Sequence, residues 1–255
     1  MRIISILLTS LVLISCNPLK DFVGGSTNLD EEFFSNQSKI LSSLNNDLVS
    51  FYKFDYFSSG YVDSLNMNAL SEFGTVTTPV VSGKYGNSLS CSSSNSTNYV
   101  ANSSPINLDF NSSQDFSVSF WVKRLSQSAS ISYVFKINSG GGSIAAYQAA
   151  ATDNLIFELG GHTAFKNSFF NDTDWKHVIL RIDRDVGVSV CVNGVCDADD
   201  GFSLSDNFTS TTIFYICTNG TVNGLNGYVD SLGIWNRFLS DIEVNALYLN
   251  QTNLN

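Results

Sequence analysis

The chain has 255 residues, of which 43% are hydrophobic and 13% aromatic, so it is long enough to bury a sizeable core within one main domain. Its formal net charge of −10 excludes the basic surface that nucleic-acid binding requires. The same charge disfavours attraction to anionic lipid head groups.

The N-terminal segment has the pattern of an export signal. Residues 1–15 carry one positive charge followed by an apolar run of about ten residues, which is too short to span a bilayer as a mature helix. The segment ends in LISC, residues 13–16, which resembles the bacterial lipobox, whose cysteine receives diacylglycerol and becomes the new N-terminus. We therefore predict a lipoprotein signal peptide at 1–15 and lipidation at Cys16. The protein would then be an extracytoplasmic, bacterial membrane-anchored lipoprotein, on the periplasmic face or the cell surface.

Two alternatives to this interpretation stay open. An ordinary secretory signal can end near a cysteine by chance. Eight N-x-S/T sequons would also suit a glycosylated eukaryotic secreted protein, although such triplets arise by chance in a chain rich in Asn, Ser and Thr, and the lipobox favours bacteria. The sequons start at Asn36, Asn95, Asn102, Asn111, Asn171, Asn207, Asn219 and Asn250.

Residues 16–47 read as a polar tether that carries one helix. Leu29, Phe33, Ile40, Leu41 and Leu44 fall on one helical face. The acidic residues 30–32 follow Thr27 and Asn28, which is typical of a helix start rather than of a catalytic pair.

From residue 48 the pattern changes to short strands, and we assign residues 48–250 to one sandwich domain. Residues 116–123, FSVSFWVK, and residues 177–182, HVILRI, alternate in the manner of strands with one buried face. Asn193-Gly194 lies between β-branched residues, which is the strongest short hairpin signal. Many short strands predict an all-β sandwich or jelly roll. The C-terminus departs from this strand pattern, because Ser240 and Glu243 form a capping box that predicts a short apolar helix.

Four cysteines follow Cys16. Cys191 and Cys196 flank the Asn-Gly turn symmetrically and face one another at a non-hydrogen-bonded position, so we predict a disulfide between them. Cys91 and Cys217 form either a second disulfide or two buried thiols. Zinc is a poor alternative, because no second cysteine pair or histidine stands at ligand spacing.

Seven segments, in order along the chain, carry a family resemblance: LVSFYKFD (48–55), VDS (62–64), GKYGNSLSC (83–91), FSVSFWVK (116–123), DWKHVILRID (174–183), VCVNGV (190–195) and GYVDSLGIWNRFLSDIEV (227–244). Together they resemble the laminin-G-like domains of the concanavalin A-like lectin and glucanase superfamily. The resemblance spans about 200 residues and implies a two-sheet antiparallel jelly-roll sandwich.

The resemblance also implies a structural calcium ion (Ca2+). In many members an acidic residue on the first strand and one on the last strand lie close together and hold calcium, which prefers hard oxygen ligands. The matching positions are Asp55 and Asp230, with Asp63 as a third ligand from the following loop. The alternative is that Asp55 and Asp230 accept hydrogen bonds from backbone amides or pair with a lysine. Relatives place glycines after the Asp-Ser pair of this loop, whereas here the chain has LNMNAL, residues 65–70. This departure weakens the comparison for the backbone carbonyls that would complete the calcium shell.

Catalysis is not expected. The laminarinase-type hydrolases of this fold place two or three carboxylates on alternate residues of one strand, and no E-x-D-x-E run occurs here. Asp183 and Asp185 alternate, but they flank Arg184 at a strand end and fit a solvated turn. The two histidines, His162 and His177, leave few ways to build a nucleophilic triad.

A non-catalytic binding or adhesion module is therefore expected, with a glycan or an extracellular protein as ligand. Trp121, His177 and Arg181 point away from the apolar alternation of their strands and would share the outer face of one sheet, where a sugar could stack. The alternative is that these side chains are covered by packing at the core rim. Trp175 and Trp235 are expected to close the core. The competing class is a structural scaffold domain of an envelope or virion assembly, and a glycoside hydrolase relative is the third possibility.

Overall fold

The structure is a computed structural model that describes residues 42–55, 61–73, 81–91, 99–198, 200–201, 203–221 and 224–249. Contacts divide the chain into Met1–Gln37 and Ser38–Asn255, and the sandwich belongs to the second unit. The predicted signal peptide, Cys16, most of the tether helix and three sequons (Asn36, Asn95 and Asn250) lie outside the described residues.

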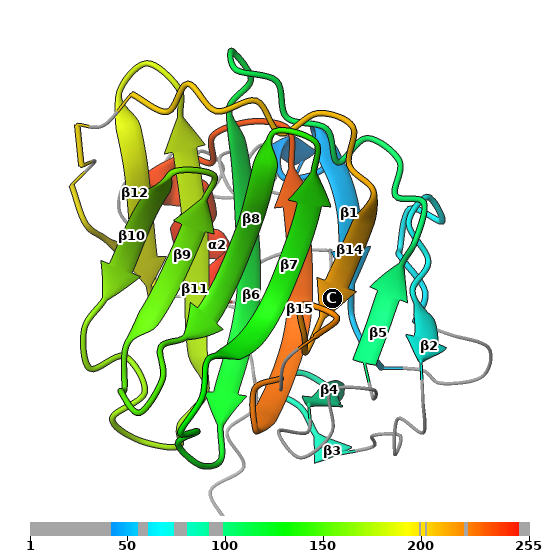
Figure 1. Cartoon of the computed structure of the whole chain (residues 1–255), viewed down its shortest axis with the longest axis vertical. Coiled ribbons are helices and arrows are strands. Elements are labelled where there is room, and N and C mark those ends of the chain that lie inside the picture. The colour runs from blue at the N-terminus through cyan, green and yellow to red at the C-terminus, as the bar shows by residue number, and fades with distance from the viewer. Residues whose placement is uncertain are drawn as a thin grey trace, which may run out of the picture. The chain divides into compact units, whose positions relative to one another are not determined.

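Two antiparallel sheets face one another, and the prediction of an all-β, two-sheet jelly-roll sandwich is confirmed (Figure 1). The sheet nearer the viewer, here the front sheet, has seven strands in the order β10-β9-β8-β7-β14-β5-β2. These span His162–Lys166, Leu155–Leu159, Gly142–Gln148, Ser132–Ser139, Ile213–Ile216, Tyr99–Asn102 and Ser71–Phe73. The other, the back sheet, has eight strands, ordered β13-β12-β11-β6-β15-β4-β3 with β1 paired to β15. These span Val195–Cys196, Gly187–Val192, Lys176–Asp183, Phe116–Arg124, Gly227–Trp235, Asn87–Cys91, Val81–Ser82 and Leu48–Tyr52.

The core forms where the inner faces of the two sheets meet. The alternation in β6 turns Phe116, Val118 and Phe120 inward, and all three are fully buried. Phe120 meets Phe135 of the front sheet edge-on, with ring centroids 5.7 Å apart. Such interdigitated rings fix the spacing of the two sheets. Because the inward side chains fill the core, a ligand site on the sheets must lie on their outer faces.

The outer side of the back sheet carries the helix α2, Asp241–Tyr248 (Figure 1). Its predicted capping box is present, because the Ser240 side chain accepts from the backbone N–H of Glu243 and the Glu243 side chain accepts from that of Ser240. Val244 and Leu247 of the helix pack with the buried Trp235. No helix in the described residues is long and apolar enough to cross a membrane.

The packed unit begins before residue 48. Leu44, expected in the tether, is fully buried, and its carbonyl accepts a 2.8 Å hydrogen bond from Trp235 Nε1. Arg237 Nη2 donates to the Ser43 carbonyl at 2.7 Å. Residues 42–47 therefore belong to the sandwich, because they supply partners that the last strand would otherwise lack.

Both pairs of cysteines are joined. The predicted Cys191–Cys196 disulfide is confirmed, and the two residues are directly paired across β12 and β13. Cys91 and Cys217 form the second disulfide, so the thiol alternative is wrong. This bond links β4 of the back sheet to the segment that follows β14 of the front sheet.

Candidate ligand-binding site

Asp63 lies in a loop and is fully buried. Its carboxylate accepts four backbone N–H groups, those of Phe51, Leu65, Met67 and Asn68, at 2.8–3.2 Å. Both carboxylate oxygens are thereby satisfied by the loop itself and by β1. The arrangement fixes the loop after β1 and leaves neither oxygen without a hydrogen-bond donor.

Asp55 and Asp230 both meet the turn between β3 and β4. Asp230 Oδ2 accepts the N–H groups of Lys84 and Tyr85 at 2.8 and 3.0 Å, and Asp55 Oδ1 accepts the N–H of Asn87 at 2.9 Å. A Cβ at Gly83 would lie 2.7 Å from Asp230 Oδ2, so glycine is what permits this approach. The buried carboxylate in the last strand is therefore satisfied by a neighbouring turn.

The three aspartates do not fit a calcium ion in this arrangement. The groups that face their oxygens are N–H donors, which a cation would repel, and the described residues contain no group of three acidic, histidine or cysteine side chains that could hold a metal. The structure shows the alternative to calcium, in which Asp55 and Asp230 accept hydrogen bonds from backbone amides. The family resemblance implies a calcium ion, but we do not expect these three carboxylates, as arranged, to bind it.

Trp121, His177 and Arg181 do lie on one outer face, that of the back sheet, because Trp121 and His177 are direct partners in β6 and β11. However, their exposed fractions are only 2%, 2% and 5%. Tyr248 of α2 stacks on Trp121 at a centroid distance of 5.9 Å, and Tyr85 covers another side of the ring at 5.8 Å. Since the rings are covered, a sugar cannot stack on them, and the predicted ligand site is not formed here.

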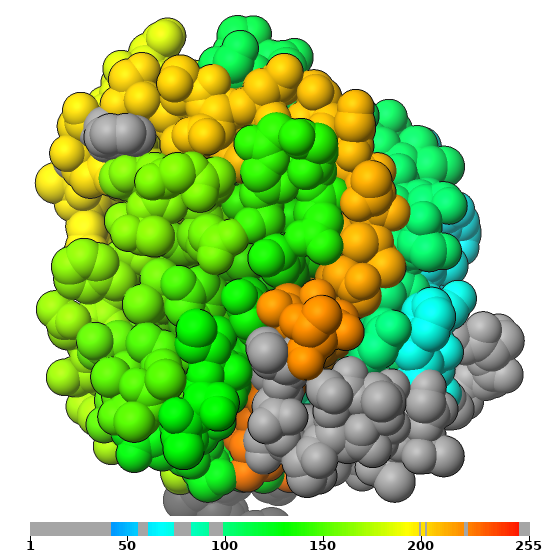
Figure 2. Space-filling model, viewed as in Figure 1, coloured from blue at the N-terminus to red at the C-terminus, as the bar shows by residue number. Residues whose placement is uncertain are grey.

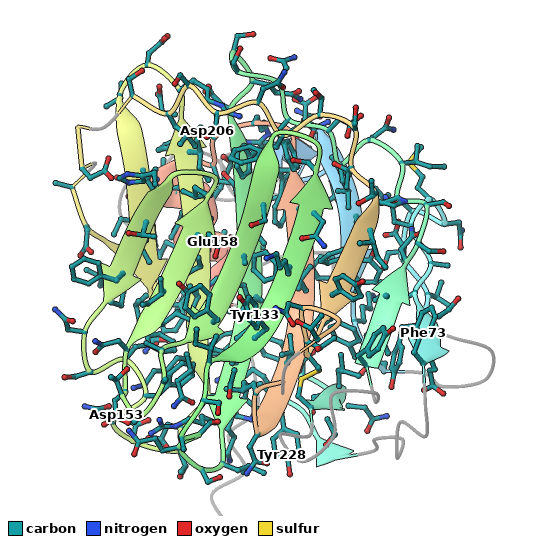
Figure 3. All side chains as sticks on the ribbon, viewed as in Figure 1. Phe73, Tyr133, Asp153, Glu158, Asp206 and Tyr228 are labelled. Carbon is teal, nitrogen blue, oxygen red and sulfur yellow. A yellow bond between two sulfur atoms is a disulfide. The ribbon has the colours of Figure 1, made fainter. Side chains whose placement is uncertain are left out.

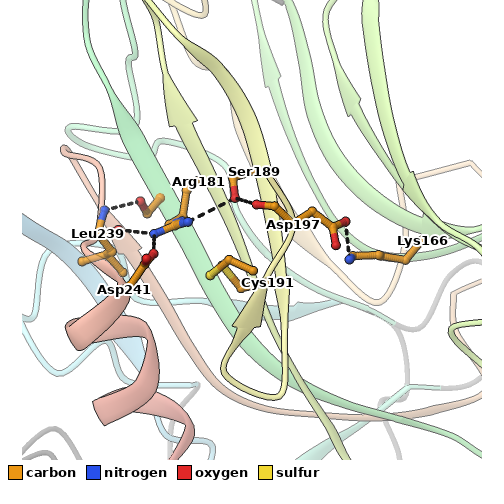
Figure 4. Close-up of a disulfide and its surroundings, with 9 residues drawn as sticks. Lys166, Arg181, Ser189, Cys191, Asp197, Leu239 and Asp241 are labelled. Atoms are coloured by element: carbon orange, nitrogen blue, oxygen red, sulfur yellow. Dashed lines mark hydrogen bonds and ion pairs between the residues drawn. A yellow bond between two sulfur atoms is a disulfide. The ribbon is translucent and has the colours of Figure 1, made fainter. Parts of the chain in front are cut away.

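Arg181 is an anchor for α2 (Figure 4). Its guanidinium donates to the Leu239 carbonyl at 2.9 Å, to Asp241 Oδ1 at 2.6 Å and to Ser189 Oγ at 3.1 Å. Asp241 is the first residue of the helix. The prediction that Arg181 contacts a ligand is therefore corrected, because its donors bind the helix start and the adjacent strand.

The front sheet, in contrast, leaves its outer face free of any described helix, and one row of that face is polar. Direct cross-strand partners run Glu158, Ala145, Lys136 and Tyr215, on β9, β8, β7 and β14. Lys136 Nζ lies 3.8 Å from Glu158 Oε1, so the ion pair spans the small side chain of Ala145. Ser143 Oγ donates to the same carboxylate oxygen.

The adjacent row of the same face is apolar and aromatic. Its direct partners are Phe165, Ile156, Tyr147 and Tyr133, on four consecutive strands. The Tyr147 and Tyr133 rings lie 5.2 Å apart, and Phe165 is 59% exposed. Rings placed beside hydrogen-bonding groups are the two elements that sugar recognition needs, because a ring covers the apolar face of a sugar and polar groups fix its hydroxyls.

A segment after β14 forms one wall of this face, and Figure 2 shows its orange atoms standing on the front sheet. Cys217 begins the segment and is bonded to Cys91. Leu225 N–H donates to the Tyr133 carbonyl at 3.0 Å, and a Cβ at Gly220 would lie 2.8 Å from the Tyr215 hydroxyl. We call residues 217–226 the wall segment, of which residues 222 and 223 are not described.

The ionisation of this face suits hydrogen bonding to a neutral ligand. Burial raises the pKa of Tyr133 and of Tyr147, and the nearby Glu158 carboxylate raises both further. Both hydroxyls therefore stay protonated. Tyr133 is only 7% exposed and its hydroxyl bonds to the Asn219 side chain, so the partly exposed Tyr147 is the tyrosine that this face offers to a ligand. Figure 3 labels both Glu158 and Tyr133 on the front sheet. With Glu158 paired to Lys136, the face carries no net charge from these two side chains.

A cavity of about 380 Å³ opens elsewhere, beside the end of β1. Lys53, Phe54, Asp55, Val62 and Ser64 line it. Phe54 is 5% exposed, so its ring offers little surface to a sugar. Asp55 already accepts a hydrogen bond from Asn87. The cavity is therefore a weaker candidate than the front face.

These observations define a class: a disulfide-linked antiparallel jelly-roll domain with one aromatic, hydrogen-bonding outer face. A family model described as the concanavalin A-like lectin/glucanases superfamily, laminin-G type, matches residues 94–245, and the chain belongs to that family. No curated protein matches the sequence significantly.

Solved structures share the fold at low sequence identity. The binding domain of botulinum neurotoxin DC in complex with rat synaptotagmin II is 11% identical with a TM-score of 0.65, over 82% of this chain and 52% of that one. A structure of botulinum neurotoxin type C, whose cell entry depends on two ganglioside molecules, is 12% identical with a TM-score of 0.63, over 83% and 53%. Domain 4 of AbnA, a GH43 extracellular arabinanase from Geobacillus stearothermophilus in complex with arabinotriose, is 22% identical with a TM-score of 0.59, over 79% and 98%. The chain thus spans about half of the toxin chains and nearly all of the arabinanase domain.

Proposed function

We propose that the protein is a non-catalytic, extracytoplasmic lipoprotein that binds glycans on the outer face of its front sheet. The single observation that carries this proposal is the Tyr147 ring beside the Glu158–Lys136 pair. An apolar platform next to a charged pair of hydrogen-bonding groups is the arrangement that a sugar ring with equatorial hydroxyls requires.

The similar structures support a glycan or protein ligand at the level of fold. One is an arabinanase domain in complex with arabinotriose. The match covers nearly the whole length of that domain. The toxin comparisons bear on half of each toxin chain, so the ligands named for them need not lie in the matched half. We therefore take the front face, rather than a neighbour's ligand, as the basis of the proposal.

The carboxylates of the front sheet support a non-catalytic role. Its described strands hold two, Glu158 and Glu72. Glu72 is the partner of the core residue Val100, so it belongs to the inner side of the sheet, whereas Glu158 lies on the outer face. A glycosidase needs an acid and a second carboxylate about 5 to 9.5 Å apart on one side of the sheet, and this face offers one of them.

Two disulfides support export from the cytoplasm, because such bonds persist in oxidising compartments. Lipidation at Cys16 would then tether the domain to the membrane and present its front face to ligands in the envelope or at the cell surface. Metabolic labelling with an alkynyl fatty acid tests the anchor, since Cys16→Ser should abolish the label.

A glycan array probed with the purified chain tests the function. We expect reproducible binding that is lost in Tyr147→Ala and retained in Tyr147→Phe, because the phenylalanine keeps the ring. Ile242→Ala, which removes an exposed apolar side chain from α2 on the outer side of the other sheet, is the control. An array that stays silent at high protein density would favour the structural scaffold domain instead.

A further inference from the structure

The described basic side chains are mostly neutralised by carboxylates. Ion pairs are formed by Arg124, Lys136, Lys166, Lys176, Arg181 and Arg237. Among the described lysines, Lys53, Lys84 and Lys123 have no carboxylate of the described residues within 4.0 Å. In a chain with a net charge of −10, few lysines lack a carboxylate partner. The positions of these lysines can therefore indicate where an anionic ligand would bind.

Two of these lysines lie on the outer face of the back sheet. Lys123 is two residues beyond Trp121 on β6 and therefore shares its face. Lys84 is exposed and stands over the Trp121 ring, with Nζ 4.3 Å from the centroid. Its backbone is fixed there, because the Lys84 N–H donates to Asp230 of β15.

Aromatic rings flank Lys123 on both sides. Tyr228 of β15 is its direct cross-strand partner, and Figure 3 shows Tyr228 at the lower end of that strand. Trp175 precedes His177 by two residues, and His177 pairs with Trp121, so the strand alternation places Trp175 on the other side of Lys123. The Trp175 and Tyr228 rings lie 6.3 Å apart, and both are partly exposed.

Trp175 and Trp235 were both expected to close the core. The prediction is confirmed for Trp235, which is fully buried, and is wrong for Trp175, which is partly exposed.

We propose that this end of the back sheet is a second binding site, for a carboxylate-bearing sugar such as a uronic acid, formed by Trp175, Tyr228, Lys123 and Lys84. The rings cover the apolar face of the sugar, and the lysine ammonium groups pair with its carboxylate. The ammonium of a lysine is a mobile point charge, so two of them can reach one carboxylate without a rigid cavity.

The surroundings favour a single carboxylate over a polyanion. Asp172 and Asp174 lie in the exposed turn directly before Trp175, and the protein as a whole is acidic. Asp172 of this turn is paired with Lys176. A ligand with many negative charges would be repelled by the acidic protein as a whole, whereas one carboxylate is attracted locally by the two lysines, because salt screens charges more distant than about 8 Å.

This site is independent of the glycan site proposed on the front sheet, since the two lie on opposite outer faces of the sandwich. Its test uses two probes that differ in one group, methyl β-glucuronide and methyl β-glucoside. The full chain is titrated with each by NMR, and the indole Nε1–H resonance of Trp175 and the backbone amide of Tyr228 report on the site.

We expect the glucuronide to shift both resonances with a Kd in the millimolar range and to bind at least fivefold more tightly than the glucoside. Lys84→Gln with Lys123→Gln should remove that preference, and Tyr228→Ala should weaken both sugars, whereas Ile106→Ala, which removes an exposed apolar side chain outside both proposed sites, should change neither. Equal affinity for the two sugars, a preference that survives the double lysine variant, or no shift at about 50 mM glucuronide would each overturn the proposal. Wild-type-like amide spectra of the variants show that they fold.

Discussion

The Lys136 ammonium lies 3.8 Å from the Glu158 carboxylate, across the small side chain of Ala145 on the strand between them. This ion pair makes the centre of the front face polar without giving it a net charge. The partly exposed Tyr147 and Ile156 and the exposed Phe165 of the neighbouring row supply the apolar half. The predictions below test whether this face and the contacts that support it behave as their geometry implies.

Glu158→Gln is expected to weaken glycan binding about five- to tenfold and to leave stability nearly unchanged. The carboxylate is a charge-assisted acceptor for sugar hydroxyls, whereas a partly exposed ion pair stabilises a fold by about 0–1 kcal/mol. Calorimetric titration with the best glycan from the array gives the affinity, and a thermal melt gives the stability. A variant that binds as well as the native chain would show that Glu158 does not contact the ligand. Asp197→Asn, which removes a different exposed carboxylate from its lysine, is the matched control.

Removal of the Cys91–Cys217 disulfide is expected to destabilise the protein more than removal of Cys191–Cys196. The two bonds close chain segments of 126 and 5 residues, and the chain-entropy model gives about 5 and about 2 kcal/mol, respectively. The first bond also fixes the wall segment, so the Cys91→Ser, Cys217→Ser variant should lose glycan affinity as well. Equal melting temperatures for the two double variants would contradict this ranking.

Asp230 and His177 are expected to oppose one another in the dependence of stability on pH. Burial raises the pKa of Asp230 from 3.8 to about 6, although hydrogen bonds from Tyr85, Ser231 and Lys84 act to lower it. Between these values the folded state holds the extra proton, so this group's contribution to stability falls as pH rises. Burial, with Lys84 nearby, lowers the pKa of His177 from 6.5 to about 3, so its contribution is complete above pH 6.5 and is lost as pH falls toward 3.

The two contributions therefore offset each other between about pH 4 and pH 6. Urea unfolding of Asp230→Asn and of the native chain across this range tests the sign. The stability of the variant, relative to the native protein, should increase with pH, with a slope of up to about 1.4 kcal/mol per pH unit. A relative stability that decreases with pH would mean that the pKa of Asp230 is lowered by the fold.

Calcium is expected to leave the melting temperature unchanged, because Asp55, Asp63 and Asp230 accept hydrogen bonds from backbone amides. Melts of metal-free protein with calcium and with chelator measure this directly. A rise of several degrees with calcium, abolished in Asp230→Asn, would instead establish the ion that the family resemblance implies.

The strands could be predicted where the buried alternation is unbroken. Residues 116–123 and 177–182 alternate without interruption, and they form β6 and β11. The covering of their outer face was not predictable, because it depends on where α2 docks. The capping box of Ser240 shows where a helix starts but not that Tyr248 will lie over Trp121.

The front face escaped detection for a related reason. A bulge between Tyr133 and Phe135 breaks the period of β7, so Tyr133 does not alternate cleanly with the core residues around it. Tyr147 follows two alanines, one inward and one outward, which blurs the assignment of faces. The signal that could have identified the site is the pair Lys136 and Glu158, two charges within otherwise uncharged strands, but their proximity depends on the register of three strands.

The most direct test of the central claim is a calorimetric titration of the native chain and Tyr147→Ala with the best glycan from the array. The account predicts at least a thirtyfold loss of affinity in Tyr147→Ala, near-native affinity in Tyr147→Phe and no change in the Ile242→Ala control. Full affinity in Tyr147→Ala would contradict a glycan site on the front sheet.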